Sequence, residues 1–187
     1  MLPLESKLAI RKRILKLLRN QKEEDRFKKN LVILRKFFAI KEVKSAKTIL
    51  FYVAFDGEVE TIDMIKRACA KGKKVAVPTI LKDKKMIIPT LIRNCEEDLE
   101  LGPYGIKHPK HNPAARLNVD ELDLVVVPGV AFDKSCHRLG RGAGYYDRFL
   151  AGLPKDVPTI GLAFDFQMVN VLPHQEHDML VSRVISN

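Results

Sequence analysis

The order of apolar and polar positions divides this chain into a helical N-terminal part and a part in which strands alternate with helices. Two amphipathic helices are predicted over residues 4–18 and 23–38, because apolar residues recur there with helical spacing, one or two turns apart. The apolar positions that define these two helices are Leu4, Leu8, Leu15 and Leu18, then Phe27, Leu31, Leu34 and Phe38.

Two continuous apolar runs follow, TILFYVAF at residues 48–55 and LDLVVVP at residues 122–128. Such runs are typical of strands buried on both faces of a parallel sheet. Shorter strands are expected at residues 74–78, 85–92, 157–164 and 181–185, with helices from Thr61 to Gly72 and over residues 145–150. Residues 95–118, which are rich in Gly, Pro, Asn and His, are expected to be mostly loop. Strands that alternate with helices predict a three-layer α/β/α sandwich with a mostly parallel central sheet.

Length and composition are those of a single soluble domain of 187 residues, with 46% hydrophobic and 30% charged residues. We divide this domain into a basic helical segment, about residues 1–44, and an α/β body, about residues 45–187. The net charge is +10, of which the first segment carries +9 and the body +1. The basic character therefore lies at the N-terminus, and a small phosphate-rich partner is enough to explain it.

The number of cysteines and the length of the apolar runs predict the cellular compartment. Cys69, Cys95 and Cys136 are odd in number and far apart, which indicates reduced thiols in a cytoplasmic protein. No apolar run is long enough to cross a bilayer, and no apolar signal segment opens the chain. The histidines at 108 and 111 and the Cys136-His137 pair lack the four-ligand spacing of a structural zinc site.

Candidate functional residues are most concentrated in residues 138–149, RLGRGAGYYDRF, which follow the predicted strand 122–128. In open α/β sheets, ligands bind outside the carboxyl ends of the strands. The three glycines of this segment let the backbone approach a ligand, and the start of the next helix adds free N–H donors. Arg138 and Arg141 are permanent cations suited to phosphate oxygens. The segment therefore predicts a polyphosphate site. The other loop at a carboxyl end, Asp56-Gly57-Glu58, should lie at the same edge.

The spacing GxGxG matches neither the GxGxxG dinucleotide motif nor the GxxxxGK[ST] phosphate loop. Asp147 follows in the first helical turn, where a carboxylate beside a phosphate loop is suited to hold Mg²⁺. An acid there also complements the helix N-terminus. Lys7 and Arg11 are one helical turn apart, so that both cations can point toward one anion or can form a solvated flank.

These motifs resemble those of 5-formyltetrahydrofolate cyclo-ligases, also called 5,10-methenyltetrahydrofolate synthetases. The resemblance rests on VVPGVAFD at residues 126–133 and RLGRGAGYYDRFL at residues 138–150. It continues through LAIRKR near the N-terminus, FDGEVET at residues 55–61 and LPHQEHD at residues 172–178, so it covers the chain from end to end. Ala143 stands where relatives usually have Gly or Lys, which argues against a side-chain contact to phosphate there.

The resemblance implies a ligase of folate one-carbon metabolism. Such an enzyme converts 5-formyltetrahydrofolate and ATP to 5,10-methenyltetrahydrofolate, ADP and phosphate with Mg²⁺. The γ-phosphoryl group passes to the formyl oxygen, and N10 of the same folate then closes the ring. Because both nucleophiles belong to the substrate, the protein must supply alignment and electrostatic stabilisation. The resemblance also implies a fold similar to the NagB/RpiA/CoA-transferase-like fold and a monomer without nucleic-acid or membrane partners.

Residue roles are carried over by matching position. The implied ATP-binding residues are Lys7, Leu8, Ala9, Ile10, Arg11, Arg138, Leu139, Gly140, Arg141, Gly142, Ala143, Gly144, Tyr145 and Tyr146. The implied folate-binding residues are Val53, Glu58, Arg141, Gly142, Ala143, Gly144 and Tyr145. Arg141 and Tyr145 are the implied catalytic residues, and Asp147 and the weaker candidate Asp178 are the implied metal ligands. The carboxylate of Glu58 can accept hydrogen bonds from the amino-pyrimidine edge of a pterin, or it can be an acid at a helix entrance.

Three alternative functions remain open from the sequence. The basic N-terminal segment fits an RNA-binding accessory protein, although an aromatic content of 7% and the lack of an RNA motif argue against it. A sugar-phosphate isomerase or acyl-CoA transferase can share the expected architecture, with Glu58 as the acting carboxylate. A folate-binding or storage module without catalysis is the third.

Overall fold

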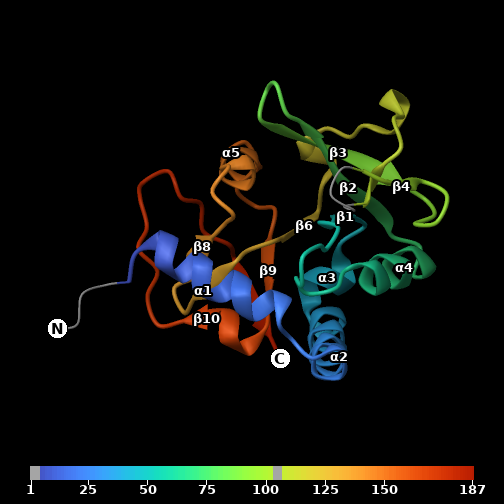
Figure 1. Ribbon diagram of the computed structural model, residues 1–187. Helices are drawn as coiled ribbons and strands as arrows, with labels where there is room; N and C mark the ends of the chain where they lie inside the picture. Colours follow the sequence, from blue (N-terminus) through green and yellow to red (C-terminus); the bar gives the residue numbers. More distant parts are fainter. Residues whose placement is uncertain (1–4, 103–106) are drawn as a thin grey trace.

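A six-stranded, mostly parallel sheet forms the centre of the computed structural model, which describes residues 5–102 and 107–187 (Figure 1). Its strand order is β11-β9-β6-β1-β2-β3. The strands are β1 (Thr48–Leu50), β2 (Lys74–Leu81), β3 (Met86–Ile92), β6 (Leu124–Val127), β9 (Thr159–Ala163) and β11 (Arg183–Ser186). Every neighbouring pair is parallel except β2 and β3. The predicted mixed α/β fold with a mostly parallel central sheet is confirmed.

Helices cover both faces of this sheet. They are α1 (Lys7–Arg19), α2 (Glu23–Ala39), α3 (Lys41–Ser45), α4 (Ile62–Ala70) and α5 (Tyr145–Ala151). Helices α1 to α4 bury their apolar residues in one cluster with Val75 and Val77 of β2. Helix α5 packs in a second cluster with Ala76, which lies between those two valines in the sequence. Since successive side chains of a strand point to opposite faces, the two clusters are the two sides of the sheet.

The two N-terminal helices form where they were predicted, but the faces that they bury are shifted from the predicted stripes, of which Leu18 is fully buried and Leu15, Leu34 and Phe38 are partly buried. The buried residues of α1 are Ile10, Ile14 and Leu18, and those of α2 are Ile33 and Phe37. Leu8 is instead 73% exposed and Phe27 is 59% exposed, so the predicted apolar stripes are wrong at these positions. Leu4 lies outside the described residues. Both candidate stripes have helical spacing, and only the position of the sheet chooses between them.

The strand predicted over residues 48–55 is shorter than expected, because β1 ends at Leu50. The chain then stays buried but leaves the sheet, and side chains take over some of its hydrogen bonds. The hydroxyl of Thr61 donates to the carbonyl of Tyr52 at 2.7 Å, and the hydroxyl of Tyr52 donates to the carbonyl of Val59 at 2.9 Å. This folded-back loop between β1 and α4 carries Glu58.

Short elements that the sequence did not reveal support residues 138–149, which we call the glycine-rich segment. Strands β7 (Ala131–Asp133), β8 (Arg138–Leu139) and β10 (Met168–Val169) form a small second sheet. The carboxylate of Asp133 accepts hydrogen bonds at 3.0 Å from the backbone N–H groups of Ser135, His137 and Leu172. The β7–β8 hairpin therefore fixes where the glycine-rich segment begins.

The remaining described residues are largely loops and short helical turns. Between β3 and β6 the chain forms a two-stranded ladder of β4 (Leu99–Leu101) and β5 (Lys107–Pro109). Short 3₁₀ turns are η2 (Pro113–Ala115), η3 (Val119–Glu121) and η4 (Asp165–Gln167). All three cysteines carry free thiols. Within residues 5–102 and 107–187, none of the helices combines the length and apolarity of a membrane span.

Candidate active site

Two cavities lie on either side of the glycine-rich segment, at the carboxyl ends of β1 and β6. Because β1 and β6 are neighbours in the sheet, the loops that follow them meet at one edge, as predicted. The first cavity, about 350 Å³, is largely apolar and reaches Val53, Glu58 and Ile80. We call it the apolar cavity. The second, about 570 Å³, reaches Lys7 and Asp178, and we call it the charged cavity.

The wall between the two cavities is the glycine-rich segment itself. Residues that line both are Arg138, Gly140, Ala143, Gly144 and Asp147. Gly142 has φ +107° and Gly144 has φ +68°, backbone conformations that residues with a Cβ rarely adopt. A Cβ on Gly140 would lie 2.9 Å from Nη1 of Arg138. The wall is therefore thin and presents bare backbone to both cavities.

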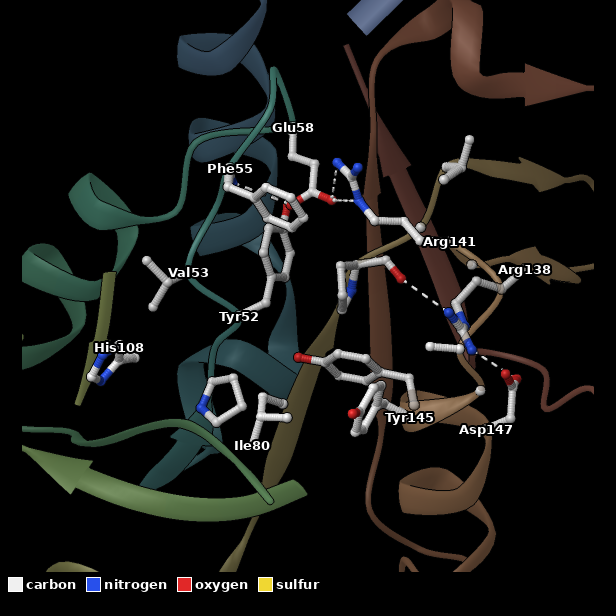
Figure 2. Close-up of a pocket in the computed structure, with 18 of the residues that line it drawn as sticks. Tyr52, Val53, Phe55, Glu58, Ile80, His108, Arg138, Arg141, Tyr145 and Asp147 are labelled. Atoms are coloured by element: carbon white, nitrogen blue, oxygen red, sulfur yellow. Dashed lines mark hydrogen bonds and ion pairs between the residues drawn. The ribbon is translucent and has the colours of Figure 1, made fainter. Parts of the chain in front are cut away.

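Arg138 is buried and engaged within the protein. Its guanidinium donates to the carboxylate of Asp147 at 2.7 Å and to the carbonyl of Pro128 at 3.3 Å (Figure 2). The sequence suggested a cation free to bind phosphate, whereas the structure gives it a carboxylate partner nine residues along the chain. Arg138 thereby holds the first turn of α5 against the end of β6.

Arg141 joins the glycine-rich segment to the loop between β1 and α4. Its Nε donates to Glu58 at 3.1 Å and its Nη1 donates to Asp56 at 3.0 Å. Its guanidinium also lies over the ring of Phe55, 4.0 Å from the ring centroid, as a cation–π contact. Figure 2 shows Arg141 and Glu58 facing each other. No role for Phe55 or Asp56 was predicted, although both stand in the FDGE motif that drew attention to Glu58.

Glu58 is a carboxylate held in a nearly closed environment, with 7% of the residue exposed. Burial raises its pKa, while the charge of Arg141 and a hydrogen bond from the N–H of Phe55 act in the opposite direction. One carboxylate oxygen faces Arg141 and the other faces that N–H at 3.4 Å. A ligand with N–H donors in the apolar cavity would find a preformed acceptor here.

Several donors in this region lack a partner. Among the described residues, the buried side-chain atoms without a hydrogen bond are Gln21 Oε1, Arg138 Nε, Arg141 Nη2 and Tyr146 Oη. Three of the four belong to residues that line the apolar cavity. Nη2 of Arg141 lies 3.1 Å from Glu58 but is not aligned for a hydrogen bond. Burial also raises the pKa of Tyr146 above the usual range, so its hydroxyl stays protonated and able to donate. Unpaired buried donors are costly, which points to a ligand that satisfies them.

The N-terminal residues predicted to bind ATP separate into two groups. Lys7 lines the charged cavity and forms an ion pair with Asp178, and Arg11 donates to the carbonyl of Gly140 at 2.8 Å. In contrast, Leu8 and Ala9 are exposed and Ile10 is buried in the core. The structure thus brings the two cations of α1 to the glycine-rich segment and directs the apolar residues between them elsewhere.

The predicted metal ligands Asp147 and Asp178 both line the charged cavity. Each is neutralised by a protein cation, Arg138 and Lys7 respectively. Within the described ranges, no group of three or more His, Cys, Asp or Glu side chains could hold a metal ion by itself. Mg²⁺ usually binds one or two carboxylates together with substrate phosphates, so these two acids fit Mg²⁺ that arrives with a nucleotide.

The remaining predicted residues are distributed over both cavities. Val53, Tyr145 and Tyr146 line the apolar cavity, and Leu139 and Gly142 line the charged one. The structure adds wall residues to which the sequence assigned no role: Tyr52, Phe55, Pro78, Ile80, Pro128 and His108. Figure 2 places His108 at the opposite end from Asp147. Phe55 and Pro128 stand in motifs that carry the resemblance, whereas the sequence neighbourhoods of the other four residues carry no signal of a shared cavity.

Comparison with known proteins agrees with this geometry. The model of a family described as the 5-formyltetrahydrofolate cyclo-ligase family matches residues 3–187. A 5-formyltetrahydrofolate cyclo-ligase of Haemophilus influenzae is 35% identical over 139 residues, 74% of each chain. One of Mus musculus is 30% identical over 189 residues, 96% of this chain and 93% of that one.

The fold is also similar to that of solved structures. The 5,10-methenyltetrahydrofolate synthetase of Aquifex aeolicus superposes with a TM-score of 0.83 at 29% identity, covering 96% of this chain and 88% of that one. The synthetase of Mycoplasma pneumoniae, 24% identical, has a TM-score of 0.78 over 97% of this chain and 99% of that one. The chain therefore belongs to the 5-formyltetrahydrofolate cyclo-ligase family, a family of enzymes.

Proposed function

We propose that this chain converts 5-formyltetrahydrofolate and ATP to 5,10-methenyltetrahydrofolate, ADP and phosphate. The observation that carries the proposal is the shared wall of residues 138–147, which separates an apolar cavity from a charged one. A phosphoryl transfer between two different substrates needs two sites whose reactive ends meet. The unpaired donors of Arg138, Arg141 and Tyr146 are also concentrated at this wall.

We place the two substrates by their chemistry. The ATP phosphates fit the charged cavity, near Lys7 and the backbone of Gly140 to Gly144. The pterin fits the apolar cavity, with its amino-pyrimidine edge on Glu58 and its ring beside Val53. Asp147 and Asp178 would hold Mg²⁺, which would neutralise phosphate oxygens when bound.

The residues of the shared wall align the two substrates and stabilise the charge on the transferred phosphoryl group. The formyl oxygen attacks the γ-phosphorus, the bond to the β-phosphate oxygen breaks, and ADP leaves. N10 then attacks the formyl carbon and loses its proton to the phosphate group, and the phosphorylated oxygen departs as phosphate, which closes the ring. Arg141 stabilises the negative charge that develops on the transferred group, and Tyr145 orients the formyl group beside it. Folate bound between the apolar walls would exclude water from the transferred phosphoryl group.

We also propose the finer features that the resemblance implied. These are the NagB/RpiA/CoA-transferase-like fold, a single domain, a monomer without nucleic-acid partners, and a cytoplasmic location. One chain lines both cavities, and α1 packs into the same core as the sheet, which supports the single domain and the monomer. The free cysteines support a reducing compartment. The comparisons do not support the alternative of an RNA-binding protein. They also do not support that of a sugar-phosphate isomerase or acyl-CoA transferase.

The test mixes purified protein with 5-formyltetrahydrofolate, ATP and Mg²⁺ and follows the near-ultraviolet absorbance of the methenyl product. We expect a rise that requires both ATP and Mg²⁺, with one ADP released for each product formed. Controls omit ATP or add EDTA. Folate binding by folded protein without ADP release would instead indicate a storage module, and ATP-independent turnover of a sugar phosphate would indicate an isomerase.

A further inference from the structure

A chain of charged side chains connects the end of α1 to the glycine-rich segment. Arg19, the last residue of α1, donates to both carboxylate oxygens of Asp56, from Nε at 2.8 Å and from Nη2 at 2.9 Å. The same carboxylate accepts from Nη1 of Arg141 at 3.0 Å, and Arg141 continues the chain to Glu58. Asp56 is thus shared between a cation on α1 and the cation of the shared wall.

The backbone fixes where this carboxylate stands. Asp56 has φ +52° and Gly57 has φ +82°, so the loop makes a tight left-handed turn. A Cβ on Gly57 would lie 2.2 Å from the carbonyl oxygen of Leu18, so the loop is pressed against the last turn of α1. The side-chain amide of Gln21 donates to the carbonyls of Leu18 and Gly57, each at 3.2 Å. The position of Asp56 is therefore set by α1 and not by the cavity.

The two carboxylates that face Arg141 differ in what a substrate does to them. Under the proposed function, Glu58 accepts hydrogen bonds from the pterin, and its hold on Arg141 weakens as it does so. Asp56 meets no such competitor, because its second partner, Arg19, is a protein side chain. The hydrogen bond from Arg19 lowers the pKa of Asp56, and that from Arg141 acts in the same direction, so the carboxylate stays charged.

We propose that Asp56, anchored by Arg19, is a positioning residue that keeps Arg141 directed at the transferred phosphoryl group while folate occupies Glu58. This inference rests on the proposed function. It assigns Asp56 to the phosphoryl-transfer step, through Arg141, and not to folate binding. A merely structural role for the same ion pairs would hold the loop on α1 and would affect folding without favouring one catalytic constant.

The first variant is Asp56→Asn. Asparagine tolerates positive φ at least as well as aspartate, so the change removes the charge and spares the turn. We expect kcat to fall about tenfold to a hundredfold, because the guanidinium of Arg141 is no longer held in position. KM for 5-formyltetrahydrofolate should change about twofold or less, because Glu58 is intact. Arg19→Gln should lower kcat in the same direction, and it tests the same anchor if Asp56→Asn does not fold.

The control is Glu5→Gln, which breaks the exposed Glu5–Arg13 ion pair beside α1 and touches neither cavity. Its kcat should match that of the wild type. A double-mutant cycle supplies the second readout: in an Arg141→Gln background, adding Asp56→Asn should change kcat by about twofold or less. All variants are compared by thermal unfolding.

The outcomes separate the two proposals. With an active wild type, an unchanged kcat in Asp56→Asn overturns this inference alone. Independent, multiplying losses in the cycle also overturn it, as does a loss of fold in both Asp56→Asn and Arg19→Gln. An inactive wild type overturns the proposed function and this inference together.

Discussion

Glu58 and Arg141 form a largely buried ion pair whose charges suit the binding of a ligand. Burial disfavours the charge on Glu58, and Arg141 supports it from 3.1 Å. A buried ion pair of this kind adds little net stability, because desolvation offsets the attraction. The pair therefore fits a binding function, in which substrate donors replace part of what Arg141 provides.

The raised pKa of Glu58 predicts how folate binding depends on pH. Only the carboxylate can accept hydrogen bonds with both oxygens, so folate affinity should fall as the pH drops through that pKa. Because the pKa is raised, the fall should begin at a higher pH than for an ordinary glutamate, whose value is 4.5. Titration calorimetry over a pH series measures it.

Glu58→Gln is the matched control for this pH series. Its folate affinity should be weaker at neutral pH and should lack that pH dependence, while its ATP affinity stays close to that of the wild type. An equal loss of folate and ATP affinity would show that Glu58 supports the whole site and does not bind the pterin.

Asp147 has one observed role, as the partner of Arg138, and one proposed role, as a Mg²⁺ ligand, and the two predict different effects of substitution. As a Mg²⁺ ligand it should set the Mg²⁺ requirement, and as the partner of buried Arg138 it should stabilise the fold. Asp147→Asn keeps an acceptor for Arg138 but removes the negative charge. We therefore expect the Mg²⁺ concentration for half-maximal activity to rise about tenfold or more. The free energy of unfolding should fall by about 1–3 kcal/mol. Activity titrations with Mg²⁺ and urea denaturation measure these effects. Lost stability with an unchanged Mg²⁺ requirement would assign Asp147 to Arg138 alone.

At the scale of elements, the glycine-rich segment works because fixed elements hold both of its ends. The β7–β8 hairpin fixes its start through Asp133, and α5 begins directly at Tyr145. Between them, Arg11 of α1 holds the carbonyl of Gly140. The segment can therefore consist of backbone with little side chain and still keep one conformation.

Gly144→Ala tests this wall, with Gly72→Ala as its control. Gly144 has φ +68° and Gly72 has φ +76°, so alanine should cost about 1 kcal/mol of stability at either position. Gly72 lies after α4, where no atom stands within 4 Å of an added Cβ, and it lines neither cavity. Only Gly144→Ala should therefore lower kcat/KM for ATP. Urea denaturation and steady-state kinetics measure the two effects, and equal activity losses in both variants would refute a special role of the wall.

At the scale of the whole molecule, the site lies where two parts of the chain meet. The β1–α4 loop and β2 line one side of the apolar cavity, and the glycine-rich segment with α5 lines the other. Helix α1 spans the two parts, through Asp56 on one side and through Gly140 and Asp178 on the other. This placement gives the basic N-terminal segment a role in assembling the site, since several of its cations are used within the protein.

The sequence by itself determined the class of fold and predicted the chemistry of the site. Apolar runs such as residues 122–128 specify buried strands, because burial on both faces leaves no polar position. The GxGxG glycines, Arg141 and Asp147 predict phosphate and Mg²⁺ chemistry from their functional groups, and the resemblance to the family implies that Glu58 binds the pterin. These features depend on local composition and spacing, which the chain carries without folding.

The tertiary structure decided which groups meet. Only the pairing of β1 with β6 brings Glu58 to Arg141, 83 residues apart. Only the sheet chooses Ile10 and Ile14 over Leu8 as the buried face of α1. The partners of Arg138 and Asp56, like the cavity wall at Ile80 and His108, come from contacts between separate elements. Contacts of this kind depend on how elements pack around a common core, and helical or strand periodicity contains no information about that arrangement.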